Sequence, residues 1–138
     1  MISKNVTVAA VNHIGKNTML EHLGIVITEL GENYLTGTMP VDHRTHQPMG
    51  LLHGGASAVL IESLGSLGSS LMVDLSKNAI VGIEINANHI RGVKSGIVTG
   101  KATLMHGGKT THVWQVDITD EAQKLVCTGR LTVLVVSK

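Results

Sequence analysis

The chain of 138 residues is long enough for one domain with a sizeable core, and its formal net charge of +1 leaves no basic face for nucleic acid. With one Trp, one Tyr and no Phe, it lacks the aromatic platforms on which nucleic-acid bases stack, so aliphatic residues must fill the core. We therefore expect a single domain, residues 1–138, that does not bind nucleic acid.

The cysteine content and the N-terminus suggest where the protein works. Cys127 is the only cysteine, which excludes an intrachain disulfide, and its apolar surroundings predict an inert core thiol. The first residues lack the apolar core of a signal peptide, and no apolar run approaches the roughly 20 residues that span a bilayer. We expect a cytoplasmic protein with no membrane span.

The first third of the chain is predicted to hold a short helix, two strands and a loop. Residues 7–14 follow a weak amphipathic pattern, and residues 24–30 and 34–39 are β-rich runs. Pro40 is expected to end the second strand, because proline cannot donate to a ladder. Residues 41–52 then form a loop.

One long helix is predicted over residues 54–72, where apolar residues recur at helical spacing: Val59, Leu60, Leu64, Leu67 and Leu71. Gly65 and Gly68 lie inside it, each at a cost of about 1 kcal/mol relative to alanine. They indicate close packing of the helix onto its sheet or onto a second copy of the chain.

Beyond Asn78 the apolar period becomes two, as in Trp114, Val116 and Ile118, which predicts four antiparallel strands. Hairpins are expected at 93–96, 106–109 and 120–124. A single long helix with one antiparallel sheet is an α+β arrangement.

The start of the long helix carries the residues best suited to chemistry. Gly54 and Gly55 offer bare N–H groups at the positive end of the helix dipole. Glu62, two turns further on, is the one acid in a setting of small and apolar residues. Polarising amides with a solitary carboxylate indicate chemistry on a carbonyl, whereas a solvated position is the plainer interpretation of Glu62. Ser66 shares its helix face and either assists it or simply packs.

The eight histidines do not predict a metal centre. His43, His46 and His53 lie close together in the sequence, but they have no nearby cysteine and no His-Glu-x-x-His pattern. A dinucleotide fingerprint, a phosphate loop and a nucleophile elbow are also missing. We expect no metal and no cofactor.

Three stretches together resemble the hotdog-fold acyl-CoA thioesterases. They are Gln47-Pro48, the string His53-Gly54-Gly55-Ala56-Ser57 with Glu62 behind it, and the strand Gly82-Ile83-Glu84-Ile85-Asn86-Ala87-Asn88-His89. The chain is most similar to the branch that includes the 1,4-dihydroxy-2-naphthoyl-CoA hydrolase of menaquinone synthesis and the proofreading thioesterase of enterobactin synthesis. The resemblance covers residues 39 to the last strand.

The resemblance implies a hotdog fold, in which a curved antiparallel sheet wraps the long helix. Two subunits would pair through their sheets, two such dimers would form a tetramer, and the site would lie at the subunit interface. Glu62 would be the nucleophile or the general base, and the amide of Gly54 would polarise the thioester carbonyl. Gln47 and His53 would position the carbonyl and thiolate ends, and Ser66 would assist the acid or its water.

The resemblance also implies where the coenzyme A arm of the substrate would lie: along Gly82, His89, Ile90, Arg91, Gly92, His106, Gly107, Gly108, Lys109, Thr110 and Thr111. Arg91 and Lys109 suit the phosphates, although ordinary solvated charge is an equally good interpretation of each.

The expected reaction is hydrolysis of an acyl-CoA thioester to a free acid and coenzyme A. An aromatic acyl group is expected, of the 1,4-dihydroxy-2-naphthoyl or hydroxybenzoyl type, against an apolar wall of Met49, Leu51 and Leu52. A carrier-protein thioester stays open as the substrate. Two alternatives remain: a hotdog dehydratase that pairs His53 with Glu62, and an acyl-thioester binding module that does not need Glu62.

Overall fold

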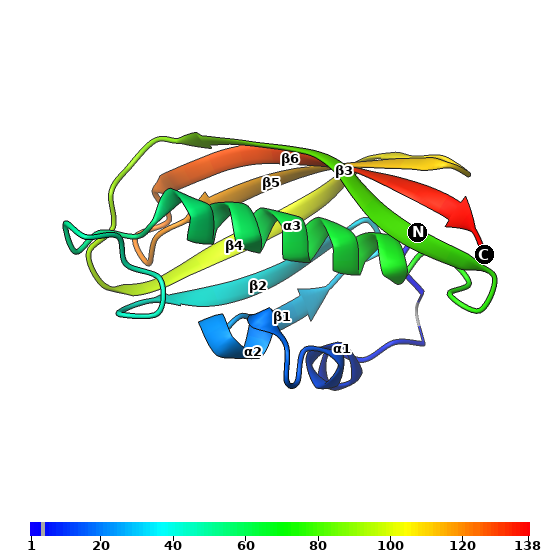
Figure 1. Cartoon of the computed structure of the whole chain (residues 1–138), viewed down its shortest axis with the longest axis horizontal. Helices are drawn as coiled ribbons and strands as arrows, with labels where there is room; N and C mark the ends of the chain where they lie inside the picture. The colour runs from blue at the N-terminus through cyan, green and yellow to red at the C-terminus, as the bar shows by residue number, and fades with distance from the viewer. Residues whose placement is uncertain (4) are drawn as a thin grey trace.

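The computed structural model describes residues 1–3 and 5–138 and shows one long helix lying across a single sheet (Figure 1). The helices are α1 (Val8–Ile14), α2 (Met19–Leu23) and α3 (Gly54–Ser70). The strands are β1 (Val26–Leu30), β2 (Tyr34–Val41), β3 (Asn78–His89), β4 (Gly96–Gly107), β5 (Thr111–Thr119) and β6 (Leu125–Ser137). All six strands pair antiparallel, in the order β1-β2-β4-β5-β6-β3, so the predicted α+β class is confirmed.

The core lies between α3 and the sheet. Leu60, Ile61 and Leu64 of the helix are fully buried, and they pack towards the alternating inward residues of the strands. The helix lies close to the sheet because Gly65 and Gly68 have no side chain. A Cβ at Gly65 would overlap Leu131 of β6, and one at Gly68 would overlap Trp114. Both glycines therefore serve packing onto the chain's own sheet, which is the first of the two roles expected for them.

Two sequence expectations are wrong, and one helix was not predicted. Pro40 does not end β2: the strand continues to Val41, and Pro40 pairs with Ile97 of β4. Pro40 lies beyond Thr38, the last residue of β2 that pairs with β1. The N–H that Pro40 lacks therefore costs no hydrogen bond between β2 and β1. The helix α2 was not predicted, and Thr18 starts it by accepting a hydrogen bond from the Leu20 N–H at 3.2 Å. Residues 93–96 form no hairpin, because β3 pairs with β6 and the chain crosses over to reach β4.

The two edge strands of the sheet, β1 and β3, differ in whether another part of the chain covers their outer edge. Asn12 of α1 lies along β1, where its side-chain amide both donates to the Ile27 carbonyl and accepts from the Ile27 N–H, each at 2.8 Å. The outer edge of β3 faces no other strand among the described residues. Val81, Ile83 and Ile85 are exposed along it.

Cys127 is fully buried in β6, and burial raises the pKa of its thiol, as expected for an inert core residue. Within the described part of the chain, no helix is long and apolar enough to cross a membrane.

Candidate active site

The loop between β2 and α3 holds Gln47 and His53 in place through its own backbone bonds. The His53 N–H donates to the Thr45 carbonyl at 2.8 Å, and the Gln47 N–H donates to the Leu51 carbonyl at 2.8 Å. Gly50, with φ of +77°, closes the turn that follows Gln47, a conformation that suits glycine. The side-chain oxygen of Gln47 accepts from the Met49 N–H, so its NH₂ group is left to donate.

The start of α3 presents one uncommitted amide. His53 is the N-cap, and its Nδ1 accepts from the Gly55 N–H at 2.7 Å. The neutral ring must then carry its proton on Nε2, which makes that atom a donor. The Gly54 N–H, in contrast, donates to no group among the residues that the structure describes. A single free N–H therefore lies at the positive end of the helix dipole.

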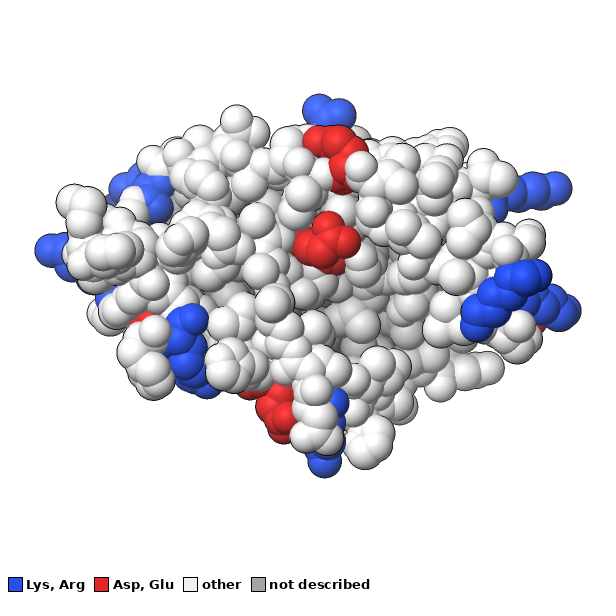
Figure 2. Space-filling view, viewed as in Figure 1, with Lys and Arg blue, Asp and Glu red and all other residues white. Residues whose placement is uncertain are grey.

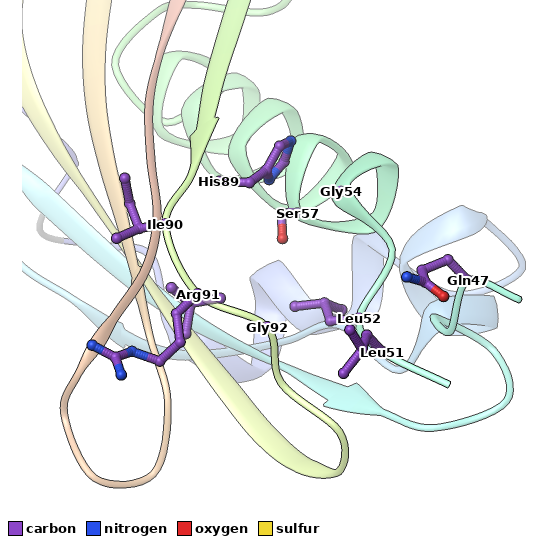
Figure 3. Close-up of a pocket in the computed structure, with 10 residues that line it drawn as sticks. Gln47, Leu51, Leu52, Gly54, Ser57, His89, Ile90, Arg91 and Gly92 are labelled. Atoms are coloured by element: carbon purple, nitrogen blue, oxygen red, sulfur yellow. The ribbon is translucent and has the colours of Figure 1, made fainter. Parts of the chain in front are cut away.

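A hollow of about 360 Å³ opens beside this helix start, and we call it the Gly54 hollow (Figure 3). His89, the last residue of β3, lies against the helix start, since a Cβ on Gly54 would be 2.7 Å from His89 Nε2. Arg91 is exposed, and in Figure 3 its guanidinium points away from Gly54 and Ser57. The lining comes from the loop, from α3 and from the segment that follows β3: Gln47, Leu51, Leu52, Gly54, Ser57, His89, Ile90, Arg91, Gly92 and Val126.

A second hollow of about 400 Å³ surrounds Glu62, and we call it the Glu62 hollow. Glu62 is half-buried, and its Oε1 accepts a hydrogen bond from Ser66 Oγ at 3.2 Å. Any side chain at Gly82 would overlap the Glu62 carboxylate, so the bare strand makes room for the acid. A β-bulge follows Gly82, a feature often found next to active sites. The other walls are mostly apolar: Ile14, Leu20, Leu67, Leu75 and Ile80, with Ser63 and Ser70.

Charge is sparse around the middle of the face that carries α3. In Figure 2 the acidic side chains near the centre are isolated spots in an uncharged surface, whereas Lys and Arg lie mainly towards the rim. This distribution suits a substrate with an uncharged acyl group and a negatively charged part at the periphery.

The two hollows do not meet on a single chain. Gly54 and Glu62 are eight residues apart on one helix, which separates them by about 12 Å along its axis. A reacting carbonyl must lie about 3 Å from both its attacking group and its oxyanion donors. The same spacing keeps His53 and Glu62 from forming the acid–base pair that a dehydratase would need within one chain.

The structure groups most of the predicted site residues into these hollows. Gln47, Gly54 and the segment 89–92 line the first, while Glu62 and Ser66 line the second with Gly82 beside them. The hairpin of residues 106–111 lines neither. Met49 is 83% exposed and lines neither hollow, so its expected place in an acyl wall stays a prediction. Ser57, which had no predicted role, points its hydroxyl into the Gly54 hollow (Figure 3).

Comparison with known proteins agrees with this architecture. The sequence profile of the thioesterase superfamily matches residues 49–127. The 1,4-dihydroxy-2-naphthoyl-CoA hydrolase of Escherichia coli is 45% identical over 129 residues, which cover 94% of each chain. The crystal structure of a mutant thioesterase from Pseudomonas aeruginosa superposes with a TM-score of 0.96 at 47% identity and covers 99% of both chains.

A thioesterase from Staphylococcus aureus adds a detail about spacing. Its solved structures share 39% identity with this chain, with TM-scores of 0.85 and 0.83, and cover 87% and 86% of it and 99% and 98% of the neighbour. One carries a glutamate-to-alanine substitution and the other a glutamine-to-alanine substitution, fifteen positions apart. Gln47 and Glu62 are separated by the same fifteen positions.

Proposed function

This chain belongs to the thioesterase superfamily and is a thioester hydrolase, and we propose that it hydrolyses aromatic acyl-CoA thioesters in a site shared by two subunits. The observation that carries the proposal is the split of the reactive groups. A free helix-start amide lies in one hollow, and a serine-bonded carboxylate lies in another, about 12 Å along the helix. Each chain thus holds two half-sites and no whole one.

A second copy of the chain can bring the halves together. If two α3 helices run antiparallel across a two-fold axis, Glu62 of one chain faces Gly54 of the partner subunit, and the reverse arrangement follows by symmetry. The long open edge of β3 supports this pairing, because it offers unpaired backbone groups and exposed apolar side chains to a second copy. The resemblance to the hotdog thioesterases further implies a dimer of dimers.

In such a site the roles follow from the chemistry of each group. The Gly54 N–H of the partner subunit and its Gln47 NH₂ are the donors that can polarise the thioester carbonyl. Glu62 either attacks the carbonyl carbon or removes a proton from the attacking water, and Ser66 holds its carboxylate. The C–S bond then breaks, the electron pair leaves with sulfur, and the thiolate takes up a proton. His53 Nε2–H is a suitable donor to that sulfur. Where Glu62 itself is the nucleophile, the acyl group stays on it as an anhydride, and water then cleaves the anhydride to release the acid and restore the carboxylate. The reaction uses water alone and needs no cofactor or metal.

The identical spacing in the Staphylococcus aureus protein supports the pairing of Gln47 with Glu62, since the residues substituted there are of the same two types. The coenzyme A arm is proposed to leave through the Gly54 hollow past Ile90 and Gly92, with Arg91 at its mouth for a phosphate. The hairpin of residues 106–111, which carries Lys109, is proposed to meet the nucleotide end from the other chain.

The acyl group is proposed to occupy the Glu62 hollow. The volume of this hollow suits a flat bicyclic ring, and its walls are mostly apolar. Two wall residues come from the N-terminal helices, Ile14 and Leu20, and three come from α3 and the segment after it, Leu67, Leu75 and Ile80. The name of the Escherichia coli relative supports a hydroxynaphthoyl-type group. Leu51 and Leu52 of the partner subunit would still contribute, because they line the Gly54 hollow.

The test is kcat/KM for benzoyl-, hydroxynaphthoyl-, hexanoyl- and palmitoyl-CoA under the same conditions, with thiol release as the signal. The aromatic thioesters are expected to lead, with medium chains close behind, since one methylene changes discrimination by only about 1–3 kcal/mol. If palmitoyl-CoA leads, the aromatic proposal is wrong, and if no thioester is cleaved, the acyl-CoA proposal is wrong as well.

A further inference from the structure

Two serines of α3 are buried, and only one of them has a partner. Ser69 is fully buried, and its Oγ accepts a hydrogen bond from the indole N–H of Trp114 at 2.8 Å. Ser57 is 1% exposed, and its hydroxyl makes no hydrogen bond with any residue that the structure describes. The two residues lie on the same helix and are equally deep, so they form a matched pair.

The hydroxyl of Ser57 is directed at the reacting end of the site. Ser57 follows Gly54 by three residues, so the two share a helix face. Side chains of a helix tilt towards its N-terminus, which carries the Ser57 hydroxyl back over the first turn. Figure 3 shows its oxygen pointing into the Gly54 hollow, between the helix start and the segment that follows β3.

Among the described residues the one fully buried side-chain polar atom without a partner is His112 Nδ1, so the Ser57 hydroxyl, which also lacks a protein partner, is open to the Gly54 hollow. A ligand that fills this hollow would displace water from the hydroxyl and would have to supply an acceptor in its place. Ala56 and Ala58 flank Ser57, so the local sequence accommodates alanine on both sides. The free Gly54 N–H and the Ser57 hydroxyl lie in the same hollow, and one acceptor that arrives with the substrate can satisfy both.

We propose that Ser57 is a catalytic residue whose hydroxyl donates a further hydrogen bond to the thioester carbonyl oxygen, beside those from the Gly54 N–H and the Gln47 NH₂. This inference rests on the proposed thioesterase site. As the carbonyl carbon becomes tetrahedral, its oxygen gains negative charge, and two donors on one helix face stabilise that charge together. When the C–S bond breaks, the carbonyl reforms and both hydrogen bonds weaken. Ser57 keeps its own proton throughout.

The experiment compares Ser57→Ala with Ser69→Ala, which remove the same atom from equally buried positions. Ser57→Ala is expected to lower kcat by about a hundredfold, as loss of one oxyanion donor commonly does, while Tm is unchanged or higher. Ser69→Ala is expected to lower Tm, because it leaves the Trp114 N–H without an acceptor, while kcat stays within twofold of wild type.

A ligand without the carbonyl oxygen separates the carbonyl role from a general role in binding. The Kd of an S-alkyl-CoA thioether is expected to be the same for wild type and Ser57→Ala. The proposal is overturned if Ser57→Ala retains kcat within twofold, or if it raises KM and the thioether Kd in parallel with little effect on kcat. Failure of wild type to cleave any acyl-CoA would instead overturn the proposed function itself.

Discussion

The two edges of the sheet contrast sharply. β1 has five residues and a bulge between Ile27 and Glu29, and Asn12 satisfies both backbone groups of Ile27 at its outer side. β3 has twelve residues, and its outer edge faces no other strand in the described part of the chain. Proteins usually shorten, bulge or cover an edge strand to prevent association. The chain does this at β1 and leaves β3 open.

The contrast between the edges agrees with the proposal that two chains share the reactive groups of one site. The strand with the open edge, β3, contacts both reactive groups. Its Gly82 makes room for Glu62, and its last residue, His89, lies against Gly54 at the start of α3. A second copy joined at this edge would bring a new Glu62 to each Gly54 hollow. The chain is therefore closed at β1 and open at β3, which is the edge that the proposed shared site requires for a second copy.

The largest effect is expected from loss of the Glu62 carboxylate, which the proposed dimer would place at the partner subunit's Gly54 hollow. Glu62→Ala should lower kcat by at least about a hundredfold, or roughly 2.7 kcal/mol of barrier, because no other acid among the described residues lines the Glu62 hollow. Fold and substrate binding should persist, as measured by circular dichroism and by the Kd of an S-alkyl-CoA. Activity within about tenfold of wild type would exclude Glu62 as nucleophile or base.

A lysine on the β3 edge should weaken the proposed dimer, whereas a lysine on the β1 edge should not. Val81 of β3 and Val26 of β1 are both 47% exposed, which makes them a matched pair. Val81→Lys places two like charges near a two-fold axis and should weaken association at least about tenfold, with a parallel loss of activity at low concentration. Val26→Lys should leave both unchanged.

Sedimentation equilibrium of the two variants, with activity measured against protein concentration, checks this expectation. Equal behaviour of Val81→Lys and Val26→Lys would mean that the open edge of β3 is not the subunit contact.

Removal of the Asn12 side chain from the outer edge of β1 should lower stability and leave activity unchanged. Asn12→Ala leaves the N–H and C=O of buried Ile27 without their partner, and should lower the free energy of unfolding by about 1–3 kcal/mol. Its kcat should stay within twofold of wild type. Urea unfolding measures the loss, and Asn33→Ala, in an exposed turn, is the control. A loss no greater than that of the control would show that Asn12 does not close the β1 edge.

The smallest effect is expected in β5, between the two edges. Burial lowers the pKa of His112, whose Nδ1 has no hydrogen-bond partner among the described residues. The unfolded chain therefore binds this proton more readily than the folded chain, and stability should fall as the pH drops below about 6.5. The slope from this residue is at most about 1.4 kcal/mol per pH unit.

His112→Gln should flatten that part of the pH profile in urea unfolding measured between pH 7 and pH 5. An unchanged slope would show that His112 titrates alike in the folded and unfolded chains.

Local patterns predicted most of the elements. The alternation through Trp114, Val116 and Ile118 correctly gave a strand with one buried face, and the spacing from Val59 to Leu71 correctly gave the long helix. The pairing of β3 with β6 could not be read from spacing, because it depends on which distant strands share the core. The short loop at 93–96 therefore suggested a hairpin that does not form.

The site was harder to predict than the fold. Glu62, Ser66 and Gly54 stand out as residue types, and the structure places each in a hollow. Ser57 gave no signal, because a serine among small helical residues looks like packing until its hydroxyl is seen without a partner. The division of the site between two hollows appears only once helix rise and strand order are combined.

The most direct test of the shared site is complementation between two inactive variants. Glu62→Ala retains the Gly54 hollow, and Gln47→Ala retains the Glu62 hollow, so a mixed dimer holds one intact site and one doubly damaged site. Co-expressed chains that associate at random should recover about a quarter of wild-type kcat, while each variant alone stays inactive. A mixture no more active than the average of the two variants would contradict a site built from two chains.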